Sequence, residues 1–345
     1  SAAMRTLRLA VVMALALAGC RCSERRDGAP RGQVVGLVTD VGGRGDQSFN
    51  DSALRGLEAW AAGMKSVDGK YVALADRDVP PELAARVQPL GIKPVVVQSK
   101  AQEDYEPNLQ LIVDSGADLI IGVGFMLENS VEAVAKENPQ SKFLLIDSPV
   151  LDAKGQPAPL PNVRTVVFKE EEGSFLVGAL AGLVAKEKVG FVGGMEIPLI
   201  QKFEAGFRAG VKTTNPKAEV LIQYTGTFDN VAHGKQAAQD LVAKGCEVIF
   251  HAAGSDGNGV IQAVKEARAA GREVFVIGVD SDQSHLAPDA VLTSMVKRVD
   301  LAVWLAASDL KAGTFAAGDS SMGLKEGGVT YAPVRVALPE KERLL

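Results

Sequence analysis

Residues 34–51 read VVGLVTDVGGRGDQSFND, and the remainder of the chain repeats the pattern of this stretch. It begins with a β-branched apolar run, passes through a glycine-rich loop and leads into a segment of helical length. A continuous rather than alternating apolar strand is typical of a parallel sheet covered on both faces. Glycines 42, 43 and 45 would let the loop backbone adopt positive φ and approach a ligand. The stretch therefore predicts a strand, a ligand-binding loop and a helix.

The same alternation of apolar runs and amphipathic segments continues to residue 312. It predicts a doubly wound α/β fold, and this number of strands fits two sheets better than one. The Pro/Gly-rich segment 149–161 is the expected crossover between the sheets. The predicted strands are Val34–Thr39, Val95–Gln98, Asp118–Val123, Phe143–Ile146, Val163–Phe168, Val189–Gly193, Val220–Tyr224, Val248–His251 and Val274–Val279. The predicted helices lie near 51–64, 103–115, 128–137, 171–187, 199–212, 231–244, 257–270 and 299–312.

The composition agrees with a large α/β protein and argues against several other classes. The chain has 345 residues, of which 47% are hydrophobic and 36 are glycine, and this suits close packing of helices on sheets. A formal net charge of −5 argues against a basic surface for binding nucleic acid. The three cysteines and three histidines show neither a disulfide pattern nor metal-ligand spacing. We therefore expect no metal, no cofactor and no nucleic-acid partner.

The first 20 residues have the layout of a secretory signal that follows a short cloning scar. Cations precede the apolar run Leu9–Ala18, which is shorter than the ~20 residues that a membrane-spanning helix needs. The run ends in Leu17–Cys20, which matches the bacterial lipobox, whose cysteine is lipidated. We expect a signal peptide over 1–20 and a tether over 21–33. Acyl chains on Cys20 would anchor the protein in the cell envelope, on the periplasmic or cell-surface side.

Polar or aromatic residues follow most of the predicted strands. In open parallel sheets, ligands bind outside the carboxyl ends of the strands. Two lobes that face each other would therefore line one cleft with these side chains. The strand-end residues are Asp40, Phe125, Asp147, Phe168, Met195, Asp229, Ser255 and Asp280.

Three residues in the first loop have distinct interpretations. Ser48 or Asn50 could cap the helix that follows the loop, because both side chains accept a hydrogen bond from a free backbone N–H. Phe49 has no clear partner on a helical face and could be an exposed stacking platform.

Seven segments carry a resemblance to one family, and they occur in the family's order across nearly the whole mature chain. They are 39–51, 168–182, 189–198, 203–207, 251–259, 277–283 and 292–300. They resemble the basic membrane protein family, whose best-known members are purine nucleoside receptor lipoproteins of ABC transporters. Residues 66–94 fit the family pattern least well.

This resemblance implies a periplasmic-binding-protein-like fold of type I. Such a fold has two Rossmann-like lobes with parallel sheets, joined by three hinge strands. The expected N-terminal lobe comprises 34–148 and 282–314. The expected C-terminal lobe comprises 149–281 and 315–345.

The resemblance also implies that the cleft holds the base of a nucleoside. Phe49 and Phe203 would clamp the purine, while Asn50 and Asp147 would lie near the edge of the base. Stacking on an aromatic side chain contributes ~1–3 kcal/mol per base. Phe207, which lies near Phe203, is expected in the core.

The ribose would be held by a second group of residues that the resemblance implies. Asp280 would accept hydrogen bonds from the ribose diol, and such charge-assisted bonds are about twice as strong as neutral ones. Lys297 would keep that carboxylate ionised. Gly254 would approach the ligand through its backbone, and Asp40 and Ser48 are further candidates.

The expected function is that of a lipid-anchored solute-binding protein. It would capture nucleosides, with purine nucleosides favoured, by hinge closure and deliver them to ABC permease subunits. No Ser-His-Asp order, metal pair or Cys-His couple emerges, so we expect no catalytic residues and no enzyme. The alternatives are an envelope signalling or regulatory lipoprotein of the same fold, and the binding of another small ligand such as a sugar.

Overall fold

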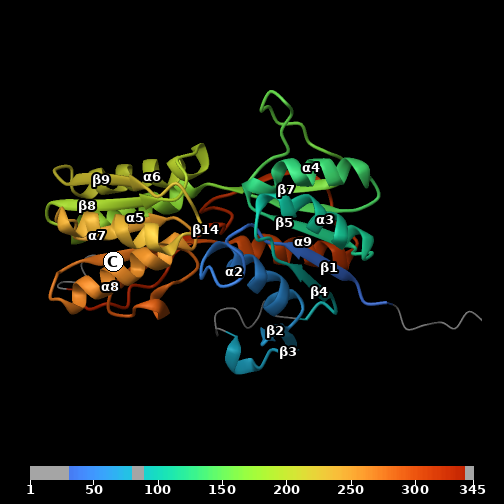
Figure 1. Cartoon of the computed structure of the whole chain (residues 1–345), viewed down its shortest axis with the longest axis horizontal. Coiled ribbons are helices and arrows are strands. Elements are labelled where there is room, and N and C mark those ends of the chain that lie inside the picture. Colours follow the sequence, from blue (N-terminus) through green and yellow to red (C-terminus); the bar gives the residue numbers. More distant parts are fainter. Residues whose placement is uncertain (1–30, 80–88, 339–345) are drawn as a thin grey trace, which may run out of the picture. The chain divides into compact units, whose positions relative to one another are not determined.

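The computed structural model describes residues 31–79 and 89–338. The described chain forms two six-stranded sheets, each flanked by its own helices, and a small two-stranded hairpin (Figure 1). This arrangement confirms the predicted α/β fold with two parallel sheets. Cys20, the signal peptide and most of the tether lie outside the described residues.

The first sheet is parallel throughout and has the order β13–β7–β6–β5–β1–β4. Because β1 lies between β4 and β5, the strand order reverses beside β1, and such a reversal marks the usual ligand crevice of this fold class. The strands are β1 (Val34–Val38), β4 (Lys93–Val97), β5 (Leu119–Val123), β6 (Phe143–Ile146), β7 (Val163–Phe168) and β13 (Gly318–Met322). The hairpin consists of β2 (Met64–Val67) and β3 (Lys70–Ala73).

Helices cover both faces of the first sheet. On one face lie α2 (Phe49–Leu54), the π-helical turn η1 (Arg55–Ala61) and α9 (Val299–Ala312). On the other face lie α3 (Tyr105–Asp114) and α4 (Glu128–Glu137), which bury a separate apolar cluster. We call this sheet and these helices the first lobe.

The second sheet has the order β14–β12–β11–β10–β8–β9. Its strands are β8 (Lys188–Gly193), β9 (Glu219–Tyr224), β10 (Val248–Ala252), β11 (Phe275–Asp280), β12 (Val291–Lys297) and the antiparallel edge strand β14 (Val329–Tyr331). One face carries α5 (Glu170–Val184) and α6 (Pro198–Thr214), and the other carries α7 (Val231–Ala243) and α8 (Asp256–Ala269). We call this sheet and these helices the second lobe.

Glycines allow α5 and α6 to pack closely. A Cβ atom added to Gly178 would lie 2.3 Å from the carbonyl oxygen of Phe207, and one added to Gly210 would lie 2.1 Å from that of Phe175. Both separations are shorter than a carbon–oxygen contact allows, so the two helices can pack at this spacing only without side chains there.

The described chain passes between the two sheets three times. The passages lie between β7 and α5, between β12 and α9, and between β13 and β14. This number agrees with the three hinge connections that the family resemblance implies.

Strand pairing corrects the expected lobe boundaries. β7 lies after the expected boundary at 148/149 but pairs with β6, so it belongs to the first sheet. β12 lies after the boundary at 281/282 but pairs with β11, so it belongs to the second sheet. β13 likewise pairs with β7 rather than with the second sheet.

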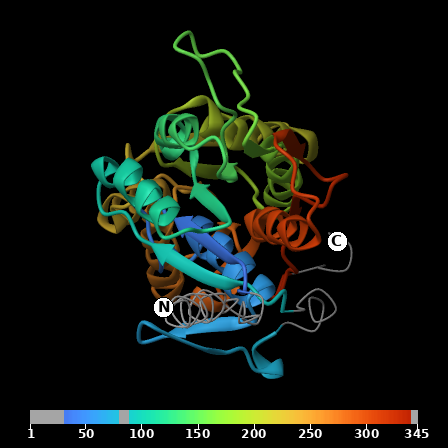
Figure 2. The ribbon, with the colours of Figure 1, turned by 90° about the vertical axis from the view of Figure 1, so that its right-hand side faces the viewer.

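The segment 149–161 is therefore not the crossover that its proline and glycine content suggested. It connects β6 with β7 inside the first sheet and projects from the first lobe in two views (Figures 1 and 2). A bridge between Leu151 and Pro157 closes this excursion into a loop.

Candidate functional site

A pocket is lined by residues from both lobes. Most of the lining follows the carboxyl ends of strands in the two sheets, as the rule for parallel sheets predicts. The lining consists of Asp40, Gly42, Asp46, Phe49, Asn50, Phe125, Asp147, Leu199, Ile200, Phe203, Phe228, Ala252, Gly254, Ser255, Val279, Asp280 and Lys297.

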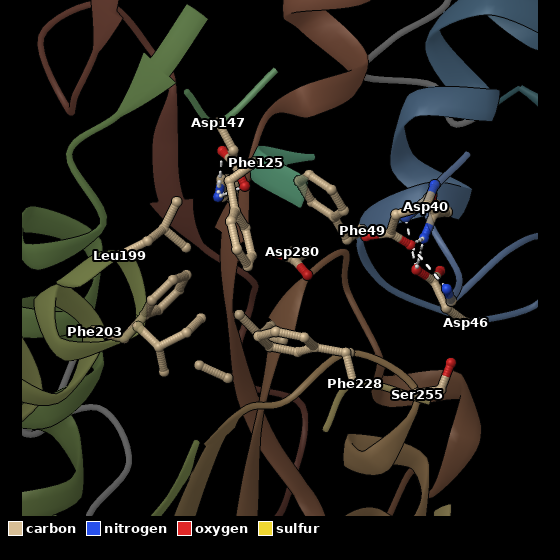
Figure 3. A pocket seen from close by; sticks show the side chains of 17 residues that line it. Asp40, Asp46, Phe49, Phe125, Asp147, Leu199, Phe203, Phe228, Ser255 and Asp280 are labelled. Atoms are coloured by element: carbon tan, nitrogen blue, oxygen red, sulfur yellow. Dashed lines mark hydrogen bonds and ion pairs between the residues drawn. The ribbon is translucent and has the colours of Figure 1, made fainter. Parts of the chain in front are cut away.

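Four phenylalanine side chains surround the pocket, two from each lobe (Figure 3). Phe49 begins α2 and Phe125 follows β5 in the first lobe, while Phe203 lies on α6 and Phe228 precedes α7 in the second. Phe125 and Phe228 meet edge to face, with ring centroids 6.2 Å apart. Aromatic faces presented from opposite walls suit a flat, conjugated ligand.

A buried ion network forms one wall of the pocket. Lys297 Nζ lies 2.7 Å from Asp147 Oδ1 and 3.0 Å from Glu170 Oε1, and all three side chains are at most 5% exposed. Lys202 Nζ forms a further pair with Glu170. Burial opposes the charged form of Lys297, but the negative charges of Asp147 and Glu170 outweigh it and raise the pKa of the lysine. The ammonium is thus permanently charged and tied to two carboxylates.

The same ammonium lies among the aromatic side chains. Lys297 Nζ is 5.2 Å from the ring centroid of Phe49 and 5.6 Å from that of Phe203. Both separations are within the range of a cation–π contact. Lys297 therefore contacts both of the residues that are expected to clamp the base.

Asp280 differs from the other carboxylates of the pocket because its side chain forms no hydrogen bond or ion pair within the described part of the chain. Its oxygen points into the pocket (Figure 3). Burial raises the pKa of Asp280 to about 8, although the charge of Lys297 opposes this rise. The charge of Lys297 thus favours the ionised form of Asp280, and the opposing effect of burial on this pKa is larger.

Asn50 joins the two remaining carboxylates of the pocket. Its Nδ2 donates to Asp40 Oδ1 at 2.7 Å and to Asp46 Oδ2 at 3.0 Å. Burial raises the pKa of Asp40 to about 7 and that of Asp46 to about 6. Because both amide protons of Asn50 are used in this way, its side chain orients the two acids rather than offering a free donor to a ligand.

Asp46, and not Ser48, caps helix α2. Ser48 occupies the N-cap position, but its side chain makes no capping bond. Asp46 instead accepts from the backbone N–H groups of Ser48, Asn50 and Asp51 at 2.7–3.1 Å. Ser48 is buried and does not line the pocket, so the structure does not place it where a ligand contact was expected.

The structure brings the other ligand-binding candidates together in one pocket. These are Asp40, Phe49, Asn50, Asp147, Phe203, Gly254, Asp280 and Lys297. Phe207 packs in the core against Phe191 and Phe250, as expected.

Sequence reasoning did not select Phe228 or Asp46 as ligand contacts, and it named Phe125 and Ser255 only as strand-end residues. Of the eight strand-end residues, Phe168, Met195 and Asp229 do not line the pocket. A residue's place after a strand shows that it lies at the correct edge of the sheet, but not which way its side chain points.

The described segments, 31–79 and 89–338, contain no helix that is both long and apolar enough to cross a bilayer. Nor do they contain a group of three or more His, Cys, Asp or Glu side chains arranged to hold a metal ion.

Comparison with known proteins gives concordant matches. The family model Bmp, described as ABC transporter substrate-binding protein PnrA-like, matches residues 33–341. The ABC transporter nucleoside-binding protein BmpA of Lactococcus lactis is 32% identical over 338 residues, which cover 93% of this chain and 88% of the relative. An uncharacterized lipoprotein of Pyrococcus horikoshii is 34% identical over 307 residues, with coverages of 86% and 68%.

A solved structure agrees with these matches. The crystal structure of an ABC transporter system solute-binding protein from Aeropyrum pernix has a TM-score of 0.73 and 33% sequence identity. The match covers 87% of this chain and 76% of that one. It supports the type I periplasmic-binding-protein-like fold.

Proposed function

Because the chain belongs to the Bmp family of PnrA-like ABC transporter substrate-binding proteins, we propose that it captures a nucleoside in the pocket between its lobes. Purine nucleosides are the favoured class, and ABC permease subunits are the partners that receive the ligand. One observation carries the proposal: aromatic side chains from both lobes lie next to a buried carboxylate that has no protein partner in the described chain.

The aromatic side chains suit the base. A purine has two π-faces, and Phe49 and Phe203 approach the pocket from different lobes, where each can cover one face. Phe125 and Phe228 add apolar surface around the same volume. The carboxylate of Asp40 can accept hydrogen bonds from the N–H groups on the pyrimidine ring of a purine such as guanine.

Asp280 suits the ribose. A diol presents two donors, and a carboxylate in a dry pocket accepts both as charge-assisted bonds. Asp280 is the carboxylate with free acceptors, whereas Asp147 is held by Lys297. Lys297 then acts by holding Asp147 and the clamp rings in place and by placing a positive charge near the sugar.

The proposed mechanism is closure of the two lobes about the three connections. A ligand that contacts both walls binds the closed state more tightly and so increases its population. Micromolar affinity requires only ~8 kcal/mol, which stacking on two faces and a few charge-assisted bonds can provide. Lipidation of Cys20 would keep this capture at the membrane surface, beside the permease.

The direct test is to identify what the protein binds. Mass spectrometry of the purified protein should detect a co-purified nucleoside, and calorimetry should show binding of inosine, guanosine or adenosine. Tight binding of a pentose or hexose without measurable nucleoside binding would replace the proposal with that of a sugar-binding protein. Release of free base from inosine would instead indicate an enzyme.

Replacing Phe49 with alanine should weaken nucleoside binding by ~1–3 kcal/mol, because one stacking surface is lost. Calorimetry measures the change, and circular dichroism should show an intact fold. Phe175→Ala is the matched control, since Phe175 lies on α5, is 36% exposed and is not part of the pocket lining. Equal affinities for the two variants would rule out stacking on Phe49.

Nucleoside affinity should fall as the pH decreases below about 8, the pKa to which burial raises Asp280. Below that value the free protein holds a proton on Asp280, and the proton must leave before the carboxylate can accept both ribose hydroxyls. The dissociation constant should then rise about tenfold per pH unit well below the pKa. Calorimetry between pH 6.5 and 9 measures this rise.

A free purine base is the control ligand for this pH series, because it lacks the ribose that Asp280 would hold. Its affinity should not follow the titration of Asp280. A nucleoside affinity that is constant across the range would contradict an ionised Asp280 as the ribose acceptor.

A further inference from the structure

Three successive carbonyl groups of the first lobe accept hydrogen bonds from the second lobe. The carbonyl oxygen of Asp46 accepts from Asn258 Nδ2 at 3.1 Å, and that of Gln47 accepts from Gln283 Nε2 at 3.0 Å. The carbonyl oxygen of Ser48 accepts from Ser281 Oγ at 3.1 Å. The acceptors lie in the loop after β1, whereas the donors lie on α8 and after β11.

None of the three donor side chains lines the pocket. They therefore join the lobes beside the ligand site without belonging to it. We refer to Asn258, Ser281 and Gln283 as the latch residues.

Gln283 is held in the orientation that its contact requires. Its Oε1 accepts from the backbone N–H of Val279 at 2.9 Å and lies 2.8 Å from His251 Nε2. Burial lowers the pKa of His251 to about 4, so the ring is neutral at neutral pH. Because an amide oxygen only accepts, the ring proton must be on Nε2. With Oε1 occupied in this way, the NH₂ group of Gln283 faces Gln47.

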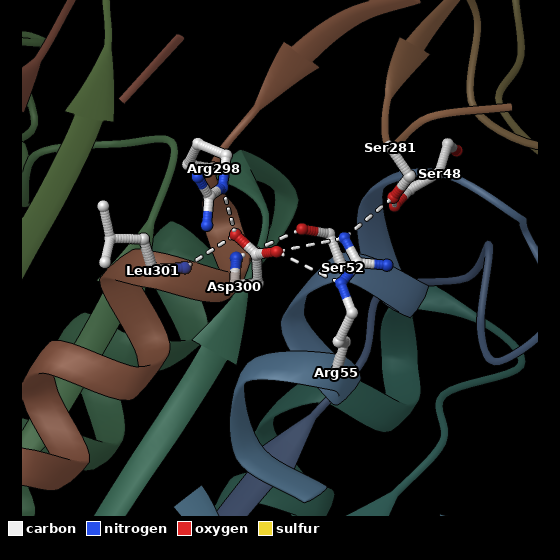
Figure 4. Close-up of polar contacts among 7 residues, drawn as sticks. All are labelled: Ser48, Ser52, Arg55, Ser281, Arg298, Asp300 and Leu301. Carbon is white, nitrogen blue, oxygen red and sulfur yellow. Dashed lines mark hydrogen bonds and ion pairs between the residues drawn. The ribbon is translucent and has the colours of Figure 1, made fainter. Parts of the chain in front are cut away.

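Ser281 connects the loop to the hinge. Its hydroxyl donates to the Ser48 carbonyl and accepts from Arg55 Nη2 at 3.2 Å (Figure 4). Arg55 Nε in turn donates to Asp300 Oδ2 at 3.1 Å. Asp300 is nearly buried and lies at the start of α9, directly after the chain leaves β12. A continuous set of polar contacts thus runs from one hinge connection to the rim of the pocket.

Arg298 fixes the hinge end of this set. Its Nε donates to Asp300 Oδ1 at 2.9 Å, and the backbone N–H of Asp300 donates to Ser52 Oγ at 3.1 Å (Figure 4). Asp300 is therefore held by residues on both sides of the connection between β12 and α9. Its position can change little unless the hinge itself moves.

We propose that the latch residues hold the lobes together directly and so help to determine how tightly the ligand is retained. This inference rests on the proposed closure of the lobes, because the three bonds can form only when the loop 46–48 meets the second lobe. Each bond favours the closed state whether or not a ligand is present. The apparent affinity of a ligand depends on the fraction of protein in the competent state. Asn258, Ser281 and Gln283 are thus positioning residues for capture.

The first experiment measures affinity and dissociation rate with guanosine and inosine. Asn258→Ala and Ser281→Ala should each raise the dissociation constant about fivefold, the effect of one ordinary hydrogen bond, mainly through faster dissociation. Together they should raise it more than either alone. The matched controls are Asn215→Ala and Ser320→Ala, which remove side-chain bonds of 3.0 Å inside one lobe, to Ala185 O and Thr165 O. The controls should leave both constants unchanged.

The second experiment needs no ligand and separates the latch from the choice of substrate. Spin labels are attached to the full chain through Glu103→Cys and Ala232→Cys, in a background with Cys20→Ser and Cys22→Ser. Both residues are exposed. Glu103 precedes α3 in the first lobe, and Ala232 lies on α7 in the second lobe. The Asn258→Ala/Ser281→Ala variant should show a smaller population at the short inter-lobe distance than the unsubstituted chain, and the control variants should not.

The outcomes distinguish the two proposals. If the chain binds no nucleoside but the distances shift as expected, the latch is supported and the proposed ligand is wrong. If nucleosides bind and the latch variants change neither the distance distribution nor the dissociation rate, the latch is overturned. A uniform loss of thermal stability in the latch variants and the controls, with no shift in distance, would also overturn it.

Discussion

Replacing Lys297 with methionine is expected to lower the free energy of unfolding by about 3–5 kcal/mol. Methionine matches the length of the lysine side chain but carries no charge. Asp147 then loses its cation, and Glu170 keeps only Lys202, in a wall where both carboxylates are at most 5% exposed. An uncompensated buried charge is strongly destabilising, and this explains the size of the expected loss.

Urea denaturation measures this loss, and two further variants test its cause. Lys235→Met breaks an exposed pair with Glu266 and should change stability by no more than about 1 kcal/mol. Adding Asp147→Asn and Glu170→Gln to Lys297→Met should recover much of the lost stability, because no buried charge then lacks a partner. A loss below about 1 kcal/mol for Lys297→Met would show that the network contributes little to stability.

Asp280→Asn is expected to weaken nucleoside binding by about 2–5 kcal/mol, which is roughly 30-fold to several thousandfold. The amide keeps the shape of the side chain but provides one acceptor in place of two and has no charge. Asparagine is also one of the few residues that tolerates the φ of 65° found at Asp280. The effect should therefore arise from chemistry rather than from backbone strain.

The free energy of unfolding of this variant should not fall, although its affinity for the nucleoside does. Burial raises the pKa of Asp280 above its value in the unfolded chain, so the folded state binds more protons and its stability falls as the pH rises from about 4 to 8. Asp280→Asn removes this dependence and should leave the protein at least as stable at pH 8. Calorimetry and denaturation on the same sample measure both effects.

Asp229→Asn is the control for Asp280→Asn, since Asp229 also follows a strand but is exposed and lies outside the pocket lining. Its affinity should equal that of the unsubstituted protein. Tight nucleoside binding by the Asp280→Asn protein would exclude the ribose role of Asp280.

The sequence predicted most strands because their apolar runs are continuous. It missed β12, whose residues Thr293, Ser294 and Lys297 interrupt the apolar pattern although all three are buried. Their polar groups find partners in the fold: Thr293 donates to Ala332 O, and Ser294 accepts from the N–H of Gln283. Such partners depend on tertiary structure, so no local pattern indicates them. β13 was missed for a different reason, since it is a polar edge strand that is exposed except at Met322.

The candidate site, like the strands, could be predicted from local sequence only in part. Residue type and position after a strand selected Asp40, Asp147 and Asp280, and the family resemblance added Phe203 and Lys297. The partner of each charge could not be predicted, because Glu170 reaches Lys297 only through the packing of α5 beside the end of β12. This undetected partner explains why the charge of Lys297 does not settle the ionisation of Asp280.

The order of strands along the chain has a consequence for synthesis on the ribosome. Five of the six strands in the second sheet lie in one uninterrupted segment, from residue 188 to residue 297. The sheet that begins with the earliest strand must wait for α9 to shield one face and for residues 318–322 to complete its edge. Although domains generally fold in the order in which they emerge, here the first sheet can be completed only after five strands of the second sheet have been synthesised.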